Sequence, residues 1–417
     1  MNSSLPEAGL SRQFNLRETF ISLKYPNYRL WFVGQLISLV GSWTQATAQG
    51  YLIYQLTQSP AYLGYVSFAS GLPSWFFSLY AGAIADRVPR RTLMVITQSC
   101  MLVLAFALAI LTFTNVIQWW HILIMAFLMG ICNAFDAPAR QAFVLEMVER
   151  EDLTNAIALN STMFNSALVL GPAIGGLIYA SVGPGLCFTI NGISFIAVII
   201  ALLLMRLKPF TPPSKKGKTW SDVKAGLKYV VEDPGIRNLI TNLFITTVFG
   251  FGIATLIPAW AVEVLGGDAT TNGFLLAARG FGSLIGALTV AAMGHFSFRG
   301  KVLTINSLLM PIMMIIFAYM RMLIPALLAM AGVGFTLMMI LNVSNAMVQT
   351  RIVDEMRGRV MGIYVFFFFG AIPLGSLLAG WAADIIGEPL TVTASALILL
   401  VFSLLTLWRV PGLRAME

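Results

Sequence analysis

The chain has 417 residues, of which 58% are hydrophobic and only 11% are charged. Soluble domains carry roughly 25% charged residues and about 45–50% apolar ones. Because a soluble core cannot bury this much apolar surface, the composition excludes a soluble enzyme, a nucleic-acid-binding domain and a disordered scaffold. The net charge of +8 is scattered between apolar blocks and offers no continuous face to a polyanion, so we expect no nucleic-acid partner.

Metal, disulfide and nucleotide chemistry are not expected. Cys100, Cys132 and Cys187 lie in apolar stretches and form no CxxC pair, and His121 and His295 are far apart in the sequence. The chain also lacks a glycine-rich phosphate loop with Lys-Ser/Thr, which argues against ATP hydrolysis. We therefore expect no metal site and no cofactor.

Twelve apolar blocks are long enough to cross a bilayer, which takes about 17–25 residues. Backbone groups in lipid have no partner outside their own helix, so all twelve are expected to be helices. The predicted fold class is an all-α membrane protein. The predicted spans are about 29–54, 61–85, 92–114, 118–144, 153–181, 186–206, 236–263, 271–295, 301–320, 323–348, 358–384 and 389–408.

Basic residues predict the orientation, because cytoplasmic loops carry an excess of Lys and Arg. With both termini in the cytoplasm, 24 of the 26 basic residues fall on the cytoplasmic side. The exceptions are Arg321, in an outer loop, and Arg279, inside the eighth span. No cleavable signal peptide is expected, since the first 28 residues are polar.

The only long polar segment between spans divides the chain into two sets of six. The predicted domains are a cytoplasmic N-terminal segment (1–28), a first six-helix bundle (29–206), a cytoplasmic linker (207–235), a second six-helix bundle (236–408) and a cytoplasmic tail (409–417).

Residue matches between the two sets indicate an internal duplication. At an offset of 209, Gly64 corresponds to Gly273, Gly71 to Gly280, and Asn133 to Asn342; Pro26 corresponds to Pro234 at 208, and Gly176 to Gly380 at 204. The shift to 204 predicts a five-residue deletion in the connection between the fourth and fifth spans of the second set. Chance matching of common helix-packing glycines is the alternative. Two homologous bundles in parallel orientation are typical of transporters that rock about a central site.

Two motifs resemble a known family. The segment Gly82-Ala83-Ile84-Ala85-Asp86-Arg87-Val88-Pro89-Arg90-Arg91 resembles the loop signature G-x-x-x-D-R-x-G-R-R of the major facilitator superfamily, with Pro89 in place of a glycine. Gly171-Pro172-Ala173-Ile174-Gly175-Gly176 resembles the core of that superfamily's antiporter signature, although residues 161–170 lack its upstream glycines. The stretches 56–60 and 136–143 are similar to bacterial enterobactin exporters and macrolide efflux pumps.

The resemblance implies a cytoplasmic latch between the two bundles. Asp86 and Arg90 would interact with Asp136 and with the start of the eleventh span; an interfacial salt bridge that only fixes topology is the alternative. The implied latch residues are Gly82, Asp86, Arg87, Arg90, Arg91, Asp136 and Arg140. The implied helix-packing residues are Gly171, Pro172, Gly175, Gly176, Pro373, Gly375 and Gly380.

The resemblance also places the first, fourth, seventh and tenth spans around a central cavity. Polar residues there would touch either substrate or a neighbouring helix. The candidate cavity residues are Ser38, Ser42, Gln45, Gln49, Asn242, Thr246, Arg279, Asn342 and Asn345. Arg279 has two interpretations: a cavity cation for an anionic or catechol-like substrate, or a structural partner of Glu263 or of carbonyl groups. Asp136 and Glu263 are the candidates for proton coupling.

The predicted function is proton-driven export of amphipathic, drug-like or siderophore-like molecules by a monomer in a bacterial cytoplasmic membrane. A lipid or nutrient transporter of the same fold is the first alternative. A membrane receptor is a weaker one, and a membrane enzyme would need a nucleophile, an acid–base pair or a metal cluster, none of which the sequence offers.

Overall fold

The computed structural model describes residues 20–85, 87–207, 220–294 and 298–409, and every regular element in them is helical. The helices are α2 (Pro26–Thr57), α3 (Pro60–Ala85), α4 (Arg90–Phe113), α5 (Trp119–Phe143), α6 (Leu153–Val182), α7 (Pro184–Leu204), α8 (Trp220–Glu232), α9 (Pro234–Ala259), α10 (Ala269–Met293), α11 (Arg299–Tyr319), α12 (Leu323–Arg351), α13 (Asp354–Ile386) and α14 (Glu388–Arg409). Short turns are η1 (Ile21–Lys24), η2 (Val144–Glu146), η3 (Arg150–Asp152) and a π-helical turn, η4 (Trp260–Val264).

Ten of the helices in the described residues are long and apolar enough to cross a membrane, which confirms the all-helical membrane class. The two further predicted spans coincide with α2 and α3, which have 32 and 26 residues. Of these two helices, α2 carries several polar side chains, among them Gln35, Gln45 and Gln49. Polar residues at this depth are expected to face protein or water and not lipid.

Local sequence explains where the helices begin and end. Pro26, Pro184 and Pro234 each stand at a first helical position, where the missing amide costs nothing. Asp233 caps α9 by accepting from the amides of Gly235 and Ile236 at 2.8 and 3.1 Å. These signals lie at the predicted boundaries of the spans.

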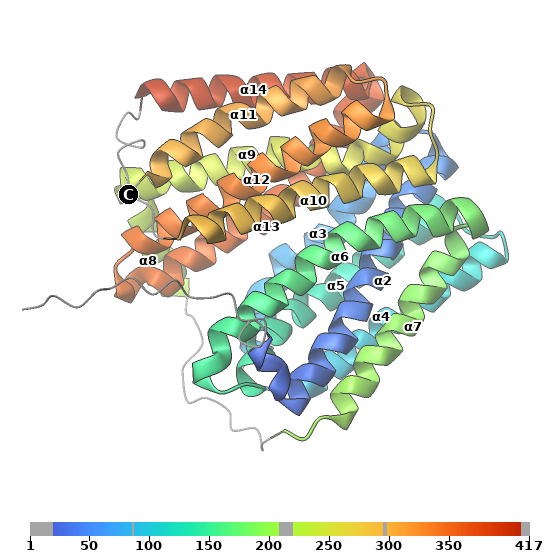
Figure 1. The fold of residues 1–417 in the computed structure, drawn as a ribbon, viewed down its shortest axis with the longest axis horizontal. Coiled ribbons are helices and arrows are strands. Elements are labelled where there is room, and N and C mark those ends of the chain that lie inside the picture. Colours follow the sequence, from blue (N-terminus) through green and yellow to red (C-terminus); the bar gives the residue numbers. More distant parts are fainter. Residues whose placement is uncertain (1–19, 86, 208–219, 295–297, 410–417) are drawn as a thin grey trace, which may run out of the picture.

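Helix neighbours repeat between the two sets of six. In the first set α2 packs on α6, α3 on α5, and α4 on α7; in the second set α9 packs on α13, α10 on α12, and α11 on α14. The main contacts between the sets are α3 with α13 and α6 with α10, which are again equivalent under the duplication (Figure 1). This pattern agrees with two related bundles, and the domain boundaries themselves stay a prediction.

The two sets meet through glycines in two equivalent places. A Cβ on Gly64 would lie 3.3 Å from the Cα of Gly380, and a Cβ on Gly176 would lie 2.9 Å from the Cα of Gly273. The duplication relates Gly64 to Gly273 and Gly176 to Gly380. Backbones therefore touch directly at both crossings, which only residues without side chains allow.

Backbone packing corrects the predicted alignment of the fourth and tenth spans. A Cβ on Gly130 would meet the carbonyl oxygen of Ser70, and one on Gly334 would meet that of Arg279. Ser70 and Arg279 correspond at an offset of 209, but Gly130 and Gly334 correspond at 204, as do the helix starts Trp119 and Leu323. The deletion thus lies in the connection before α12, and its predicted place after the tenth span was wrong.

This correction changes the counterparts of the charged residues in the fourth span. At an offset of 204, Asn133 and Asp136 correspond to Leu337 and Ile340, and not to Asn342 and Asn345. The charged cluster is still present in one set only, as predicted.

The π-helical turn η4 accounts for a second change of offset. Pro26 and Pro234 correspond at 208, whereas Gly64 and Gly273 correspond at 209. A π-helical turn accommodates one extra residue within a helix, and η4 lies between Pro234 and Gly273.

Alanine at Gly176 or Gly273 should destabilise the protein, because each new Cβ would lie 2.5 Å from a backbone oxygen of the opposite set. Overpacking of this kind costs about 1–3 kcal/mol. We expect the melting temperature in detergent to fall by several degrees. Gly50→Ala is the matched control, since its Cβ would make an ordinary 3.5 Å contact with Pro258. Equal melting temperatures for Gly176→Ala and Gly50→Ala would contradict the packing account.

Candidate functional site

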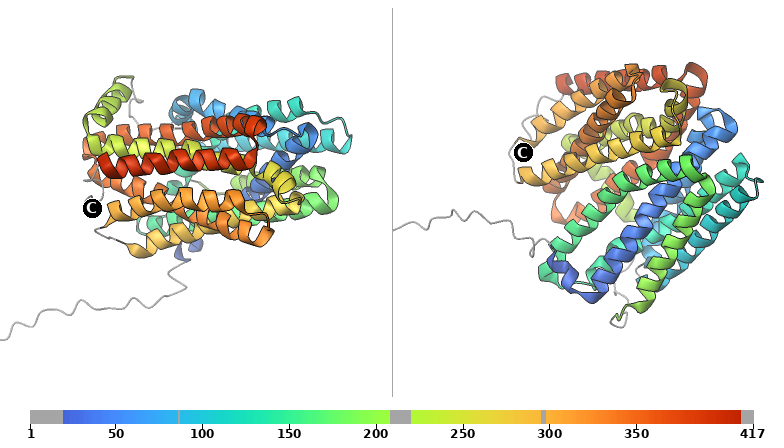
Figure 2. Two further views of the ribbon diagram at one scale, coloured as in Figure 1. Left: turned by 90° about the horizontal axis from the view of Figure 1, so that it is seen from above. Right: turned by 45° about the vertical axis from the view of Figure 1, so that its right-hand side comes forward.

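The two ends of the helices differ in how the two sets approach each other. We call the end with Tyr25, α8 and Arg409 the termini side, and the end with Thr57, η4 and Ile386 the distal side. In Figure 1 and in the right view of Figure 2, the two sets approach on the distal side and diverge towards the termini side.

Two hydrogen bonds join the sets on the distal side. The hydroxyl of the buried Tyr54 donates to Oε1 of Glu263 at 2.8 Å, and the hydroxyl of Ser59 donates to Oδ1 of Asp384 at 2.5 Å. Tyr54 lies near the end of α2 and Glu263 lies in η4, so this bond joins the distal ends of the first and seventh spans. Each bond has its hydroxyl on the first set and its carboxylate on the second.

The implied latch is only partly within the described residues. Asp86 lies outside them, so its contacts are not described. Arg90 forms an ion pair with Glu146, whereas the resemblance implied a contact with Asp136; that part of the prediction was wrong. Arg91 donates to the carbonyls of Leu203 and Met205 at 2.7 and 3.2 Å and so caps the end of α7.

The two remaining implied latch residues near α3 lie at its termini-side end. Arg87 is exposed. A Cβ on Gly82 would meet no atom within 4 Å. Neither observation tests the implied role.

Asp136 joins α4 to α5. Its side chain is 1% exposed and accepts hydrogen bonds from Oγ1 of Thr97 at 2.9 Å and Nε2 of Gln98 at 3.1 Å. Nε of Arg140 lies 3.6 Å from the other carboxylate oxygen, as the i,i+4 spacing predicted. Sequence reasoning missed Thr97 and Gln98, because only the tertiary packing of two helices brings them to the carboxylate.

The glycine-proline signatures pack against neighbouring helices. A Cβ on Gly171 or Gly175 would meet Trp43 or the backbone of Thr44 on α2, and one on Gly375 would meet the carbonyl of Val248 on α9. Pro172 lies in the same buried stretch of α6, and Pro373 packs on Gly71 of α3. These contacts are consistent with the structural role that the resemblance implied.

Several candidate cavity residues are engaged in helix contacts. Nδ2 of Asn191 on α7 donates to Oε1 of Gln45 at 2.8 Å, and Ser42 donates to Oδ1 of Asn191 at 3.4 Å. Ser38 is buried nearby on the same helix. Of the two roles considered for these residues, contact with substrate or with a neighbouring helix, the structure shows the second. Asn191 was missed, and the available signal was a lone asparagine inside the apolar sixth span.

The candidate cavity residues of the seventh span are buried, whereas those of the tenth span are half-buried. Thr246 donates to Oδ1 of Asn242 at 3.0 Å, and Nδ2 of Asn242 lies 3.5 Å from Ser307 Oγ on α11; both are buried. Asn342 and Asn345 are half-buried, as is Gln49 on α2. Asn345 accepts from Gln349 of its own helix.

Arg279 lies near the midpoint of α10, deep among protein atoms, yet its side chain keeps accessible surface. Its guanidinium carbon lies 5.0 Å from the ring centre of Phe251 on α9. Glu263, which the sequence offered as its partner, is instead bound by Tyr54. The structural pairing of Arg279 with Glu263 is therefore wrong.

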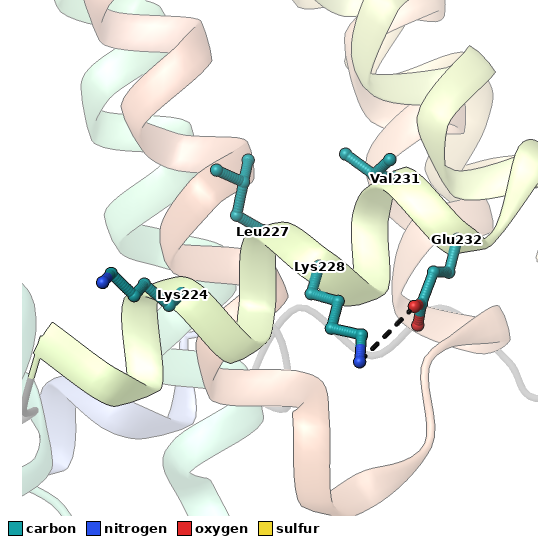
Figure 3. Close-up of a pocket in the computed structure, with 5 residues that line it drawn as sticks. All are labelled: Lys224, Leu227, Lys228, Val231 and Glu232. Atoms are coloured by element: carbon teal, nitrogen blue, oxygen red, sulfur yellow. Dashed lines mark ion pairs between the residues drawn. The ribbon is translucent and has the colours of Figure 1, made fainter.

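A shallow surface depression on α8 lies apart from these residues. It is lined by Lys224, Leu227, Lys228, Val231 and Glu232, with Lys228 and Glu232 paired at 3.7 Å (Figure 3). All five side chains come from one helix. The depression is a helix surface and not a substrate site.

An ion pair on the termini side holds α12 to the start of α9. Nε of Arg351 contacts both carboxylate oxygens of Asp233 at 3.1 Å. Burial opposes ionisation of Asp233, but the bonds from Arg351 and from the amides of Ile236 and Gly235 outweigh it, so its pKa lies below the usual value. The stabilisation is present at neutral pH and is lost as the pH falls through the lowered pKa.

A sequence profile of the family described as transmembrane secretion effectors matches residues 18–417. The chain belongs to this family. It is a multi-pass transporter of the major facilitator superfamily in a bacterial cytoplasmic membrane, and not an enzyme, as the sequence predicted.

Curated relatives match most of the transporter's length. The staphyloferrin A transporter of Staphylococcus aureus is 25% identical and aligns over 86% of this chain and 90% of its own. The multidrug efflux pump Tap of Mycolicibacterium fortuitum is 27% identical, over 88% and 91%. Macrolide efflux protein A of Streptococcus pyogenes is 24% identical, over 87% and 92%.

Solved structures share the fold at low sequence identity. The nucleoside transporter NupG has a TM-score of 0.71 at 12% identity, over 92% of this chain and 98% of that one. A bacterial homologue of the human lysosomal transporter Spinster, in an inward-facing and unoccupied conformation, has a TM-score of 0.70 at 13% identity, over 96% and 99%.

The Tyr54–Glu263 bond should couple the two sets energetically. We expect Tyr54→Phe and Glu263→Gln each to lower the melting temperature, and the double variant to lower it by less than their sum, with a coupling of about 1 kcal/mol. Ser59→Ala combined with Glu263→Gln is the control pair and should be additive. Additivity in the Tyr54–Glu263 cycle would show that the bond contributes nothing.

Proposed function

We propose that the transporter is a secondary exporter of amphipathic small molecules that works by alternating access. The observation that carries the proposal is the pair of equivalent glycine crossings at which the two related sets meet. Two bodies joined at equivalent, side-chain-free crossings can tilt past one another without separating. Export is supported by two relatives that are efflux proteins, the multidrug efflux pump Tap and macrolide efflux protein A; a third relative is the staphyloferrin A transporter.

The proposed topology has twelve spans with both termini in the cytoplasm. The helices α2 and α3 supply the two spans beyond the ten apolar ones, because each is as long as its neighbours and packs among them. The basic residues gather at the termini side, which we therefore assign to the cytoplasm. The predicted segments 1–28 and 409–417 would then be cytoplasmic, with 207–235 linking the bundles 29–206 and 236–408.

The proposed conformation is closed on the distal, outer side. Support comes from the two cross-set hydrogen bonds there and from the divergence of the helices towards the cytoplasmic side (Figure 2). The reverse tilt would break the bond between Tyr54 and Glu263 and bring the latch residues Gly82 and Arg87 towards the start of α13.

The proposed energy source is the proton-motive force, with no bound cofactor. Asp136 and Glu263 are the candidates, because they lie towards opposite ends of the helices and each carboxylate accepts hydrogen bonds that protonation would weaken. The proposed working unit is a monomer whose partners are its small-molecule substrate and the bilayer.

Transport should run outward against a gradient. In everted membrane vesicles that accumulate an acidic interior, we expect uptake of a neutral amphipathic solute such as 2-naphthylacetamide, and loss of uptake when an ionophore collapses the proton gradient. Movement of solute in the opposite direction, or movement of lysolipid only, would favour the nutrient or lipid alternative and contradict export.

Neutralising a coupling carboxylate should uncouple transport. We expect Asp136→Asn or Glu263→Gln to lower gradient-driven uptake at least about tenfold while downhill exchange of the same solute continues, because the proton step alone is lost. Glu232→Gln is the control, since this exposed carboxylate pairs with Lys228 one turn away on α8. Full gradient-driven uptake in both test variants would exclude these two carboxylates from coupling.

A further inference from the structure

Arg279 stands apart from the other charged residues of the long helices. It lies near the middle of α10, whereas the other acidic and basic residues in the described parts of these helices lie closer to an end. Unpaired cations at the depth of the hydrocarbon core are costly and mark functional positions by default. The guanidinium of Arg279 therefore needs a partner that supplies negative charge or hydrogen-bond acceptors.

No carboxylate of the described residues balances it. The two acidic residues nearest to the interior have other partners: Asp136 is bound by Thr97, Gln98 and Arg140, and Glu263 is bound by Tyr54. Among the described residues, the interaction of the Arg279 guanidinium is the contact with the ring of Phe251. That ring attracts a cation but offers no hydrogen-bond acceptor oxygen.

The backbone of Arg279 lies directly against the neighbouring helix α12. A Cβ on Gly334 of α12 would fall against the Arg279 carbonyl, which shows that the two helices are in direct backbone contact here. The equivalent contact in the first set is Gly130 against Ser70. The same backbone contact therefore occurs in both sets, but only the second set has an arginine at this position.

The ring of Phe251, which borders the guanidinium, packs on a further aromatic ring. Phe251 meets the ring of Phe368 on α13 at 5.9 Å, edge to face, and about two helical turns away along α9 Phe244 meets Phe367 at 5.6 Å. All four rings are half-buried, so each keeps accessible surface, as Arg279 does. A cation with free donors thus lies beside an accessible apolar wall.

We propose that Arg279 binds an anionic group, such as a carboxylate, of an amphipathic substrate whose apolar body packs on Phe251 and Phe368. This inference rests on the proposed function and names its substrate class. The planar guanidinium suits a carboxylate because it presents paired donors in a fixed fork. A substrate anion would supply the acceptors that the described residues do not.

Three probes that share one ring system test the charge preference: 2-naphthylacetate, its neutral amide 2-naphthylacetamide, and the cation 2-(2-naphthyl)ethylamine. Binding to the purified full-length protein in detergent is followed by calorimetry. We expect the acetate to bind at least about tenfold more tightly than the amide or the amine, since a charge-assisted hydrogen bond is roughly twice as strong as a neutral one.

Variants test whether Arg279 causes the preference for the acetate over the amide. Arg279→Gln should abolish the difference between acetate and amide, and Arg279→Lys should keep part of it, because lysine retains the charge without the fork. Phe251→Leu should weaken acetate and amide alike. Arg321→Gln is the matched control, because that arginine donates to the carbonyls of Ala318 and Met320 in a distal connection; it should bind all three probes as the unaltered protein does.

Equal binding of the three probes, no binding of the acetate, or a preference that survives Arg279→Gln would each overturn the inference. Its failure is distinguishable from failure of export. If the vesicles export the amine and Arg279→Gln exports it equally, with no preference in the binding assay, export stands and the anion site falls. If the Arg279-dependent preference holds but no probe moves outward, the anion site stands and export falls.

Discussion

Backbone contact between glycines of opposite sets is the constraint on which the rest of the structure depends. Gly64 meets Gly380 and Gly176 meets Gly273, and the duplication exchanges the two pairs. A side chain there would meet the backbone of the opposite set, which opposes the close packing of α3 along α13 and of α6 along α10. The same crossings bring the first and seventh spans together where Tyr54 reaches Glu263, and they hold α10 so that Arg279 stays in the interior.

Polar residues within the spans serve two different purposes. Ser42, Gln45 and Asn191 satisfy one another between α2 and α7, and Thr97 and Gln98 do the same for Asp136 between α4 and α5. Such pairs hold a bundle together as one body. Arg279 has no partner of that kind among the described residues, which is why it, and not the polar stripe of the first span, is the stronger candidate for substrate contact.

Much of the fold follows from the sequence, because span length, hydropathy and the placement of proline and glycine are local properties. All twelve predicted spans coincide with helices, and the matches between halves correspond to real packing positions at Gly64 and Gly176. Contacts across helices were less predictable. Arg90 pairs with Glu146 because helix packing, and not spacing along the sequence, selects its partner. The predicted offset of the tenth span was wrong because a deletion in a short connection leaves no sequence signal. The π-helical turn explains the change from 208 to 209 only once its geometry is known.

If the two sets move against each other on the distal side, a reversible cross-link between them there should stop transport. In a protein whose native cysteines are replaced by serine, Ser59→Cys and Asp384→Cys would be joined by a short bifunctional methanethiosulfonate, since these side chains touch across the sets. We expect the linked protein to lose export and a reductant to restore it, while each single variant treated alike keeps its export. Full turnover by the linked protein would show that the sets do not move apart there during transport.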